Sequence, residues 1–179
     1  SDSAAASGFN QATLTASLTN GKVSAITIVN GGSEYGTPVA TFPAPTAMTF
    51  NPATAVNLSN DTITLTTAQA AALENGDQVT YNSGGGLSIG NLNSTTSYFV
   101  VNKSGNTIKL EASVGNGAID LNSVGSGTSH TLTGQTATVS FTNENGQVKA
   151  IEISETGFGY SGSSLSVSFS GTAEGSSTT

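Results

Sequence analysis

Two stretches of the chain read almost alike: NGKVSAITIVNGGSEYG at residues 20–36 and NGQVKAIEISETGFGYS at residues 145–161. In the first, Asn-Gly joins two runs in which apolar and polar residues alternate, ATLTASLT (12–19) and KVSAITIV (22–29). Such alternation predicts β-strands. Asn-Gly between two strands is the strongest short signal for a hairpin, because a type I′ turn needs positive φ at both central residues. The second stretch follows TATVSFT (136–142) and a slightly longer turn, NENG, and continues as QVKAIEIS (147–154). The sequence therefore predicts two related hairpins.

Each hairpin leads into a glycine-rich corner and a third strand, PVATF (38–42) or LSVSF (165–169). Glycine at a corner permits a bulge or a left-handed residue, and a tyrosine beside it can cover the exposed backbone. We expect structural roles in these turns and corners for seven residues: Asn20, Gly21, Gly32, Tyr35, Gly146, Gly157 and Tyr160. In the strand 22–29, strict alternation places Val23, Ala25 and Thr27 on one face and Ile26 and Ile28 on the other.

The segment between the two units has a different sequence pattern. Short strands separated by Asn, Gly and Ser turns are predicted at 61–65, 77–81, 96–101, 107–112, 118–121 and 129–133. One helix is predicted over 66–76, because Thr66 and Gln69 form a capping box, alanines follow, and Asn75-Gly76 ends the run. This pattern is typical of a small β-sandwich or barrel-like module.

The predicted fold class is all-β: two copies of a three-stranded repeat unit flank a small sandwich or barrel-like module with one short helix. We expect an N-terminal arm and first repeat at 1–52, an inserted module at 53–134, and a second repeat with a polar tail at 135–179. The sequence leaves two arrangements open. The module is either inserted into one repeat-built domain, or the three parts follow one another like beads.

The composition excludes several functions. The 179 residues carry a net charge of −7, with four lysines and no arginine, so we expect no nucleic-acid partner. We expect no membrane insertion, because no apolar run approaches the roughly 18 residues that a spanning helix needs. Cysteine is absent, so disulfides and thiolate metal sites are excluded. Ser and Thr make up about 30% of the chain. Such polar, acidic, cysteine-free β proteins favour an extracellular location or the exterior of a virion.

No motif joins a nucleophile to a base, so no catalytic residue and no enzymatic activity are predicted. The single histidine, His130, is interpreted as a surface or packing residue of a strand. No cofactor is predicted. Calcium is the one metal considered, since turns rich in Asp and Asn supply oxygen ligands, but no calcium-loop motif is present. Contact with a glycan is considered for four tyrosines: Tyr35, Tyr81, Tyr98 and Tyr160.

The middle segment carries the phrases DTITL, ENGDQVTYN, IGNLNSTTSYFVVN, NTIKLEAS, GAIDL and GSGTSHTL. In these phrases it resembles a module of virion and tail-associated proteins of cyanobacterial phages. It is also similar to modules in large surface proteins of aquatic bacteria. The flanking pattern of NGxVxAIxI, Gly-x-x-Tyr and V-x-F resembles a repeat of the same kinds of protein. The resemblance covers about residues 10–171 and implies an external, repetitive, structural or adhesive part with no transferable active site.

The expected function is that of a non-enzymatic structural subunit of an external assembly, such as a virion tail-fibre, tail or decoration component. Alternatives are a subunit of a secreted bacterial surface filament and a carbohydrate-binding adhesion module. Expected partners are copies of the chain itself or other virion or filament proteins, and cell-surface glycan is also considered. Residues 1–19 are the candidate for a strand that one subunit adds to another.

Overall fold

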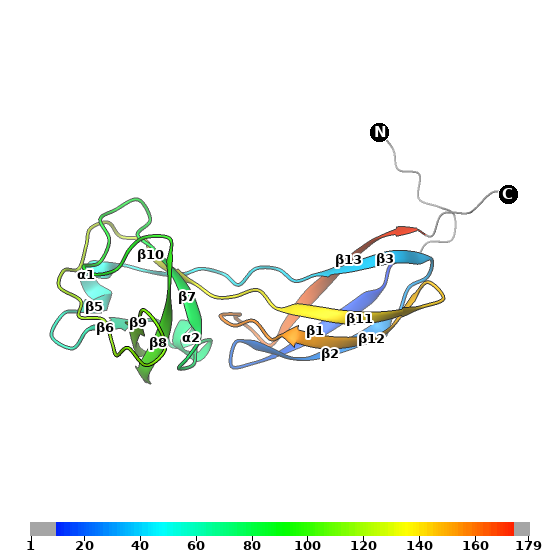
Figure 1. Ribbon diagram of the computed structural model, residues 1–179, viewed down its shortest axis with the longest axis horizontal. Coiled ribbons are helices and arrows are strands. Elements are labelled where there is room, and N and C mark those ends of the chain that lie inside the picture. Colours follow the sequence, from blue (N-terminus) through cyan, green and yellow to red (C-terminus); the bar gives the residue numbers. More distant parts are fainter. Residues whose placement is uncertain (1–9, 174–179) are drawn as a thin grey trace.

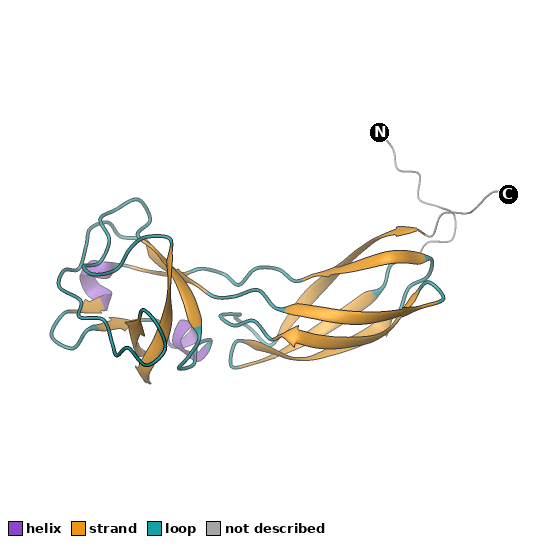
Figure 2. Ribbon diagram, in the orientation of Figure 1, coloured by secondary structure: helices purple, strands orange, loops and turns teal. Residues whose placement is uncertain are grey.

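The computed structural model describes residues 10–173, which form two antiparallel β domains arranged along one long axis (Figures 1 and 2). In the first domain a four-stranded sheet, in the order β2-β1-β13-β3, lies with a two-stranded sheet, β11-β12. Its strands are β1 (Thr13–Thr19), β2 (Lys22–Asn30), β3 (Tyr35–Thr41), β11 (Thr138–Glu144), β12 (Gln147–Glu155) and β13 (Ser164–Ala173).

The second domain is a seven-stranded sheet in the order β4-β10-β7-β8-β9-β6-β5. Its strands are β4 (Met48–Phe50), β5 (Val56–Asn57), β6 (Thr62–Thr64), β7 (Gln78–Asn82), β8 (Thr96–Ser104), β9 (Thr107–Glu111) and β10 (His130–Thr133). The described residues contain two short helices, α1 (Pro52–Ala55) and α2 (Thr67–Ala71), where the sequence predicted one. The all-β fold class is confirmed.

The two repeat units share one domain, and the module is inserted between them. Strand β13, the third strand of the second unit, pairs with β1 of the first unit in the register Leu14↔Val167 and Ala16↔Leu165. It then continues along β3, with Phe169 opposite Ala40. A strand of one unit thus completes the sheet of the other, so the insertion arrangement is the one observed, and the beads arrangement is not. We call this domain the frame and the inserted domain the module.

This pairing also corrects the role expected for residues 1–19. Thr13–Thr19 is strand β1, held on both edges by β2 and β13 of its own chain, so it is not a strand added to a neighbour. The first nine residues lie outside the described part of the chain.

The two hairpins have the same strand register. Leu14 pairs with Ile28 in the first, and Val139, 125 positions later, pairs with Ile153 in the second. Each hairpin has two register shifts, and both fall at equivalent positions. One shift skips Ser24, because Ser17 lies opposite Ala25 and Leu18 opposite Val23. The predicted face is therefore wrong for Val23 alone: this bulge turns it to the interior side of Ile26 and Ile28, while Ala25 and Thr27 are exposed on the other side as predicted.

The frame has a narrow core. In the described part of the frame, eleven residues of this core are buried, and a further nine apolar residues along the strands are only half-buried. The buried set comprises Ala12, Leu14, Ala16, Val23, Tyr35, Phe42, Ala137, Val148, Tyr160, Val167 and Phe169. The half-buried set is Leu18, Ile26, Ile28, Ala40, Val139, Phe141, Ile151, Ile153 and Leu165.

The module has a larger core, built from every one of its longer strands. Its buried members include Ile63, Leu73, Val79, Tyr81, Ile89, Val100, Ile108, Leu110 and Leu132. The predicted capping box forms: Thr66 Oγ1 accepts from the Gln69 N–H, and Gln69 Oε1 accepts from the Thr66 N–H. Gln69 Nε2 also donates to the carbonyl of Thr49 at 3.1 Å. Since β4 is an edge strand, this amide covers part of an edge that would otherwise be open.

Three predicted elements of the module need correction. The module's sheet already begins at Met48, before the predicted boundary at 53. Residues 118–121 do not form a strand, because their backbone is held by single bonds, from Ile119 N–H to the Leu110 carbonyl and from Leu121 N–H to Asp61 Oδ1. The helix ends at Ala71 rather than 76.

The turn geometry yields a first prediction. Gly21 has φ +73°, and a Cβ there would lie 2.5 Å from the Ala72 carbonyl oxygen, whereas Gly105 has φ +55° and open space around it. We expect Gly105→Ala to cost about 1–2 kcal/mol in free energy of unfolding, the strain of a left-handed residue. Gly21→Ala should cost clearly more, because a backbone clash is added. Chemical denaturation of both variants measures the difference, and equal losses would contradict the packing of Gly21 on Ala72.

Candidate functional site

All four tyrosines considered for glycan contact are buried. The exposed fractions are 0% for Tyr35 and Tyr81 and 3% for Tyr98 and Tyr160. With no ring face at the surface, a sugar cannot stack on them, and this burial corrects the expected glycan contact. In Tyr81 and Tyr160, burial raises the pKa of the hydroxyl.

The tyrosines bind backbone groups instead. Tyr35 accepts the N–H of Ala12, and Tyr160, 125 positions later, accepts the N–H of Ala137 at 2.9 Å. Tyr160 also donates to the Pro43 carbonyl at 3.1 Å. Each corner tyrosine thus covers the backbone where the first strand of its own unit begins.

Tyr81 holds the one histidine of the chain inside the module. His130 is fully buried, and its Nδ1 lies 2.8 Å from the hydroxyl of Tyr81. The other ring nitrogen lies 2.9 Å from the carbonyl of Ser126, which can only accept, so Nε2 carries the proton. Tyr81 also accepts the N–H of Ile89. Both nitrogens of His130 are used in packing the loops of the module.

The hairpin turns have the expected backbone geometry. Asn20 and Gly21 have φ of +51° and +73°, and Asn145 and Gly146 have φ of +50° and +70°. The corner glycines Gly32 and Gly157 also have positive φ, +68° and +58°.

Each turn is bonded to the corner of the other unit. The N–H of Tyr160 donates to the Gly21 carbonyl at 3.1 Å, and the N–H of Tyr35 donates to the Gly146 carbonyl at 3.0 Å. A second pair behaves in the same way. Val23 N–H donates to the Thr156 carbonyl at 2.9 Å, and Val148 N–H donates to the Gly31 carbonyl at 3.0 Å. The donors and acceptors exchange between the units, so the frame has an approximate two-fold axis.

The module docks at one end of this two-fold frame, which we call the junction end. There, the ring of Phe158, only 7% exposed, packs into the core of the module. The next N–H, of Gly159, donates to the Ala72 carbonyl at 3.1 Å. Gly21 lies so close to Ala72 that no side chain fits between them. One aromatic anchor and two backbone contacts therefore fix the module on the frame.

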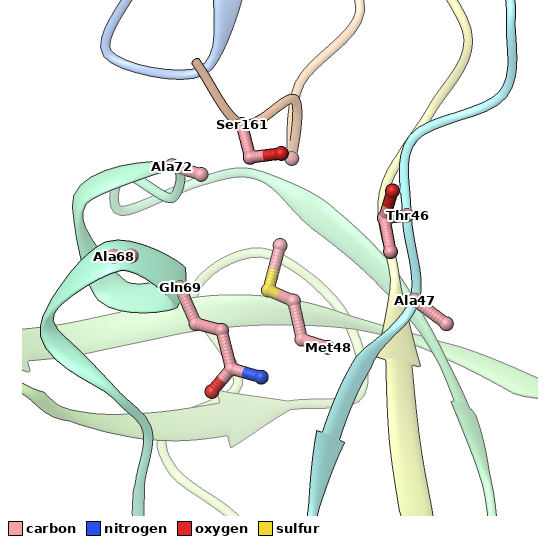
Figure 3. Close-up of a pocket in the computed structure, with 8 residues that line it drawn as sticks. Thr46, Ala47, Met48, Ala68, Gln69, Ala72 and Ser161 are labelled. Carbon is pink, nitrogen blue, oxygen red and sulfur yellow. The ribbon is translucent and has the colours of Figure 1, made fainter.

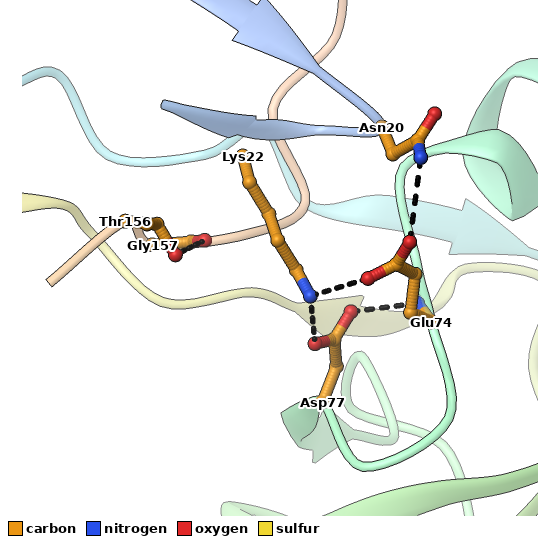
Figure 4. A network of polar contacts seen from close by, with 6 residues as sticks. All are labelled: Asn20, Lys22, Glu74, Asp77, Thr156 and Gly157. Carbon is orange, nitrogen blue, oxygen red and sulfur yellow. Dashed lines mark hydrogen bonds and ion pairs between the residues drawn. The ribbon is translucent and has the colours of Figure 1, made fainter. Parts of the chain in front are cut away.

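A small charged network adds to the junction (Figure 4). Lys22 Nζ lies 2.6 Å from a Glu74 carboxylate oxygen and 3.2 Å from one of Asp77. Asp77 also accepts the N–H of Glu74 at 2.7 Å, and Asn20 donates to Glu74 at 3.4 Å. The bond from Lys22 lowers the pKa of Glu74, and the bond to Glu74 raises the pKa of Lys22.

The opposite end of the frame lacks these docking groups. The approximate two-fold axis makes Phe158 equivalent to Ser33, Gly159 to Glu34, and Lys22 to Gln147. The aromatic anchor and the cation are thus both on the junction side. The chain also passes between frame and module at this end, after β3 and before β11 (Figure 1), so the connections place the module there and these side chains hold it in position.

Neither a metal centre nor a membrane span can be assigned from residues 10–173. They hold no group of three or more His, Cys, Asp or Glu side chains arranged for a metal ion, so no residue is assigned to calcium. In the same range no helix has the length and apolar character to span a membrane. Comparison with protein-family models, curated proteins and solved structures finds no match for this chain.

The aromatic anchor can be tested by exchanging it for the residue at its two-fold mate. We expect Phe158→Ser to cost about 3–5 kcal/mol in free energy of unfolding, the loss typical of removing a core phenylalanine. It should also split the calorimetric transition, because the module and the frame would unfold separately. Val29→Ser, near the opposite end of the frame with its side chain 66% exposed, is the control and should change neither quantity appreciably. A Phe158→Ser protein with one unshifted transition would contradict the anchoring role.

The charged network predicts a pH-dependent contribution. Because the pKa of Glu74 is lowered in the folded protein, ionised Glu74 stabilises the fold above pH 4.5. This stabilisation is lost as pH falls through the lowered pKa. Because the pKa of Lys22 is raised in the folded protein, protonated Lys22 stabilises the fold below pH 10.5. This stabilisation is lost as pH rises through the raised pKa. Lys22→Gln should therefore cost about 1 kcal/mol at pH 7, since Lys22 and Glu74 are partly exposed. The difference from the native protein should be smaller at pH 3. Urea unfolding at both values tests this, and a pH-independent difference would refute it.

Proposed function

We propose that the protein is a non-enzymatic structural subunit of an external assembly, most consistent with a virion tail-fibre, tail or decoration component. The observation that carries this proposal is the docked architecture, in which an interlocked frame and a module anchored at one end form a single elongated body (Figure 1). The groups that the sequence offered for chemistry serve packing: His130 binds two loops, and the four tyrosines lie inside the domains.

Several properties support an external structural role. The frame holds its shape through backbone hydrogen bonds between its two units, and Phe158, Gly159 and Lys22 fix the module on it. The resemblance of the repeat and the module to phage tail and bacterial surface proteins favours the same role. The partners we propose are copies of this chain or other virion or filament proteins, at the virion or cell exterior.

The test is to locate the protein by immunogold electron microscopy, with antibodies raised against the purified chain. Particles and whole cells of the source culture are labelled, and antibody preabsorbed with the chain is the control. Labelling of virion tails or capsids is the expected result. Gold along cell-attached filaments would instead favour the bacterial filament subunit. Labelling confined to the soluble cell fraction would overturn an external structural role altogether.

A further inference from the structure

Three hollows lie beside α2, and each shares at least one lining residue with the next. The first, of about 280 Å³, begins at the Asn20-Gly21 turn, and the second, of about 200 Å³, shares Ala68, Ala72 and Ser161 with it. The third, of about 290 Å³, meets the second at Gln69 and continues to α1. Figure 3 shows the middle hollow, with α2 on one side, the Thr46–Met48 segment on the other, and Ser161 of the frame above. We call the whole feature the α2 groove.

The lining of the α2 groove carries no charged side chain, although the chain has a net charge of −7. The floor of its third hollow is apolar, with Phe50 and Leu65 almost fully buried. Polar groups surround this floor. Neither the hydroxyl of Thr49 nor that of Thr64 makes a hydrogen bond within the described chain, and Asn51 uses only Oδ1, which accepts the N–H of Ala53. Ser161 in the middle hollow is likewise without an internal partner.

This chemistry selects a class of ligand. Without a cation or a carboxylate, the groove offers nothing to a phosphate, a nucleotide or a metal ion. Hydroxyl and amide groups around an apolar floor match the hydroxyls and C–H faces of a sugar ring, because such sites combine an apolar surface with a few placed polar groups. The walls at Ala68, Ala71 and Gly162 are formed by small residues.

An extended peptide is the competing occupant, and the structure disfavours it. Such a peptide gains affinity by adding a strand to an open sheet edge. The edge here is β4, and Gln69 Nε2 already occupies the Thr49 carbonyl. The groups that stay available are side-chain hydroxyls and an amide rather than a row of backbone partners. We propose that the α2 groove binds a neutral oligosaccharide. Of the four tyrosines only Tyr160 lines the groove, where it is almost fully buried at the first hollow, and the site does not depend on the structural role proposed above.

The test is a glycan array probed with the purified full chain, followed by calorimetric titration of the best neutral oligosaccharide. Thr64→Val and Thr49→Val each remove one hydroxyl at an exposed position while keeping the shape of the side chain. Each should weaken binding about tenfold, the effect of one lost hydrogen bond. Ala68→Gln places a longer side chain between two hollows and should abolish binding. Thr15→Val, on the outer face of β1, is the matched control and should bind like the native chain.

Circular dichroism melting of each variant confirms that the fold persists. Binding of a neutral oligosaccharide, with the predicted losses, supports the proposal. An array without any neutral binder overturns it, as does equal affinity in all variants. Binding of the synthetic peptide SDSAAASGF in the same groove, lost in Ala68→Gln, would also overturn it in favour of a peptide occupant.

Discussion

The hydrogen bonds exchanged between the two repeat units are the constraint on which the rest of the structure depends. The turn of each unit ends at a carbonyl that the corner tyrosine of the other unit binds through its backbone N–H, at 3.1 Å for Tyr160 and 3.0 Å for Tyr35. Neither unit can satisfy these groups alone, and buried backbone groups left without partners are costly. The narrow apolar core of the frame is therefore supplemented by a closed set of backbone bonds.

The function we propose comes from breaking this symmetry at a few positions. The junction end carries Phe158, Gly159 and Lys22, and the equivalent positions at the other end are serine, glutamate and glutamine. These differences place an apolar anchor and a cation on one side only. They help to dock the module in a fixed position, and the first two hollows of the α2 groove lie where Ser161 of the frame faces α2.

The features that could be predicted from the sequence are local ones. The hairpins, corners and capping box each depend on residues a few positions apart, such as Asn20 with Gly21 or Thr66 with Gln69. The bulge at Ser24 could not be predicted, because the sequence of β2 shows only an alternating pattern and the shift appears only in its pairing with β1. The junction could not be predicted either, because Lys22 and Glu74 are far apart in the sequence, as are Phe158 and the core of the module. They come into contact only in the folded chain. One signal was present: Phe158 and Gly159 of the second repeat occupy the positions of Ser33 and Glu34 in the first.

The central claim is that the two units form one cooperative frame, and native-state hydrogen exchange of four amides tests it most directly. These are the cross-unit donors Val23, Tyr35, Val148 and Tyr160. Amides that open only on global unfolding share one exchange free energy, whereas amides in separate units open with different ones. The account predicts one common free energy for all four, equal to that of unfolding the frame. Exchange of Val23 and Tyr35, in one unit, at a free energy well below or above that of Val148 and Tyr160, in the other, would contradict it.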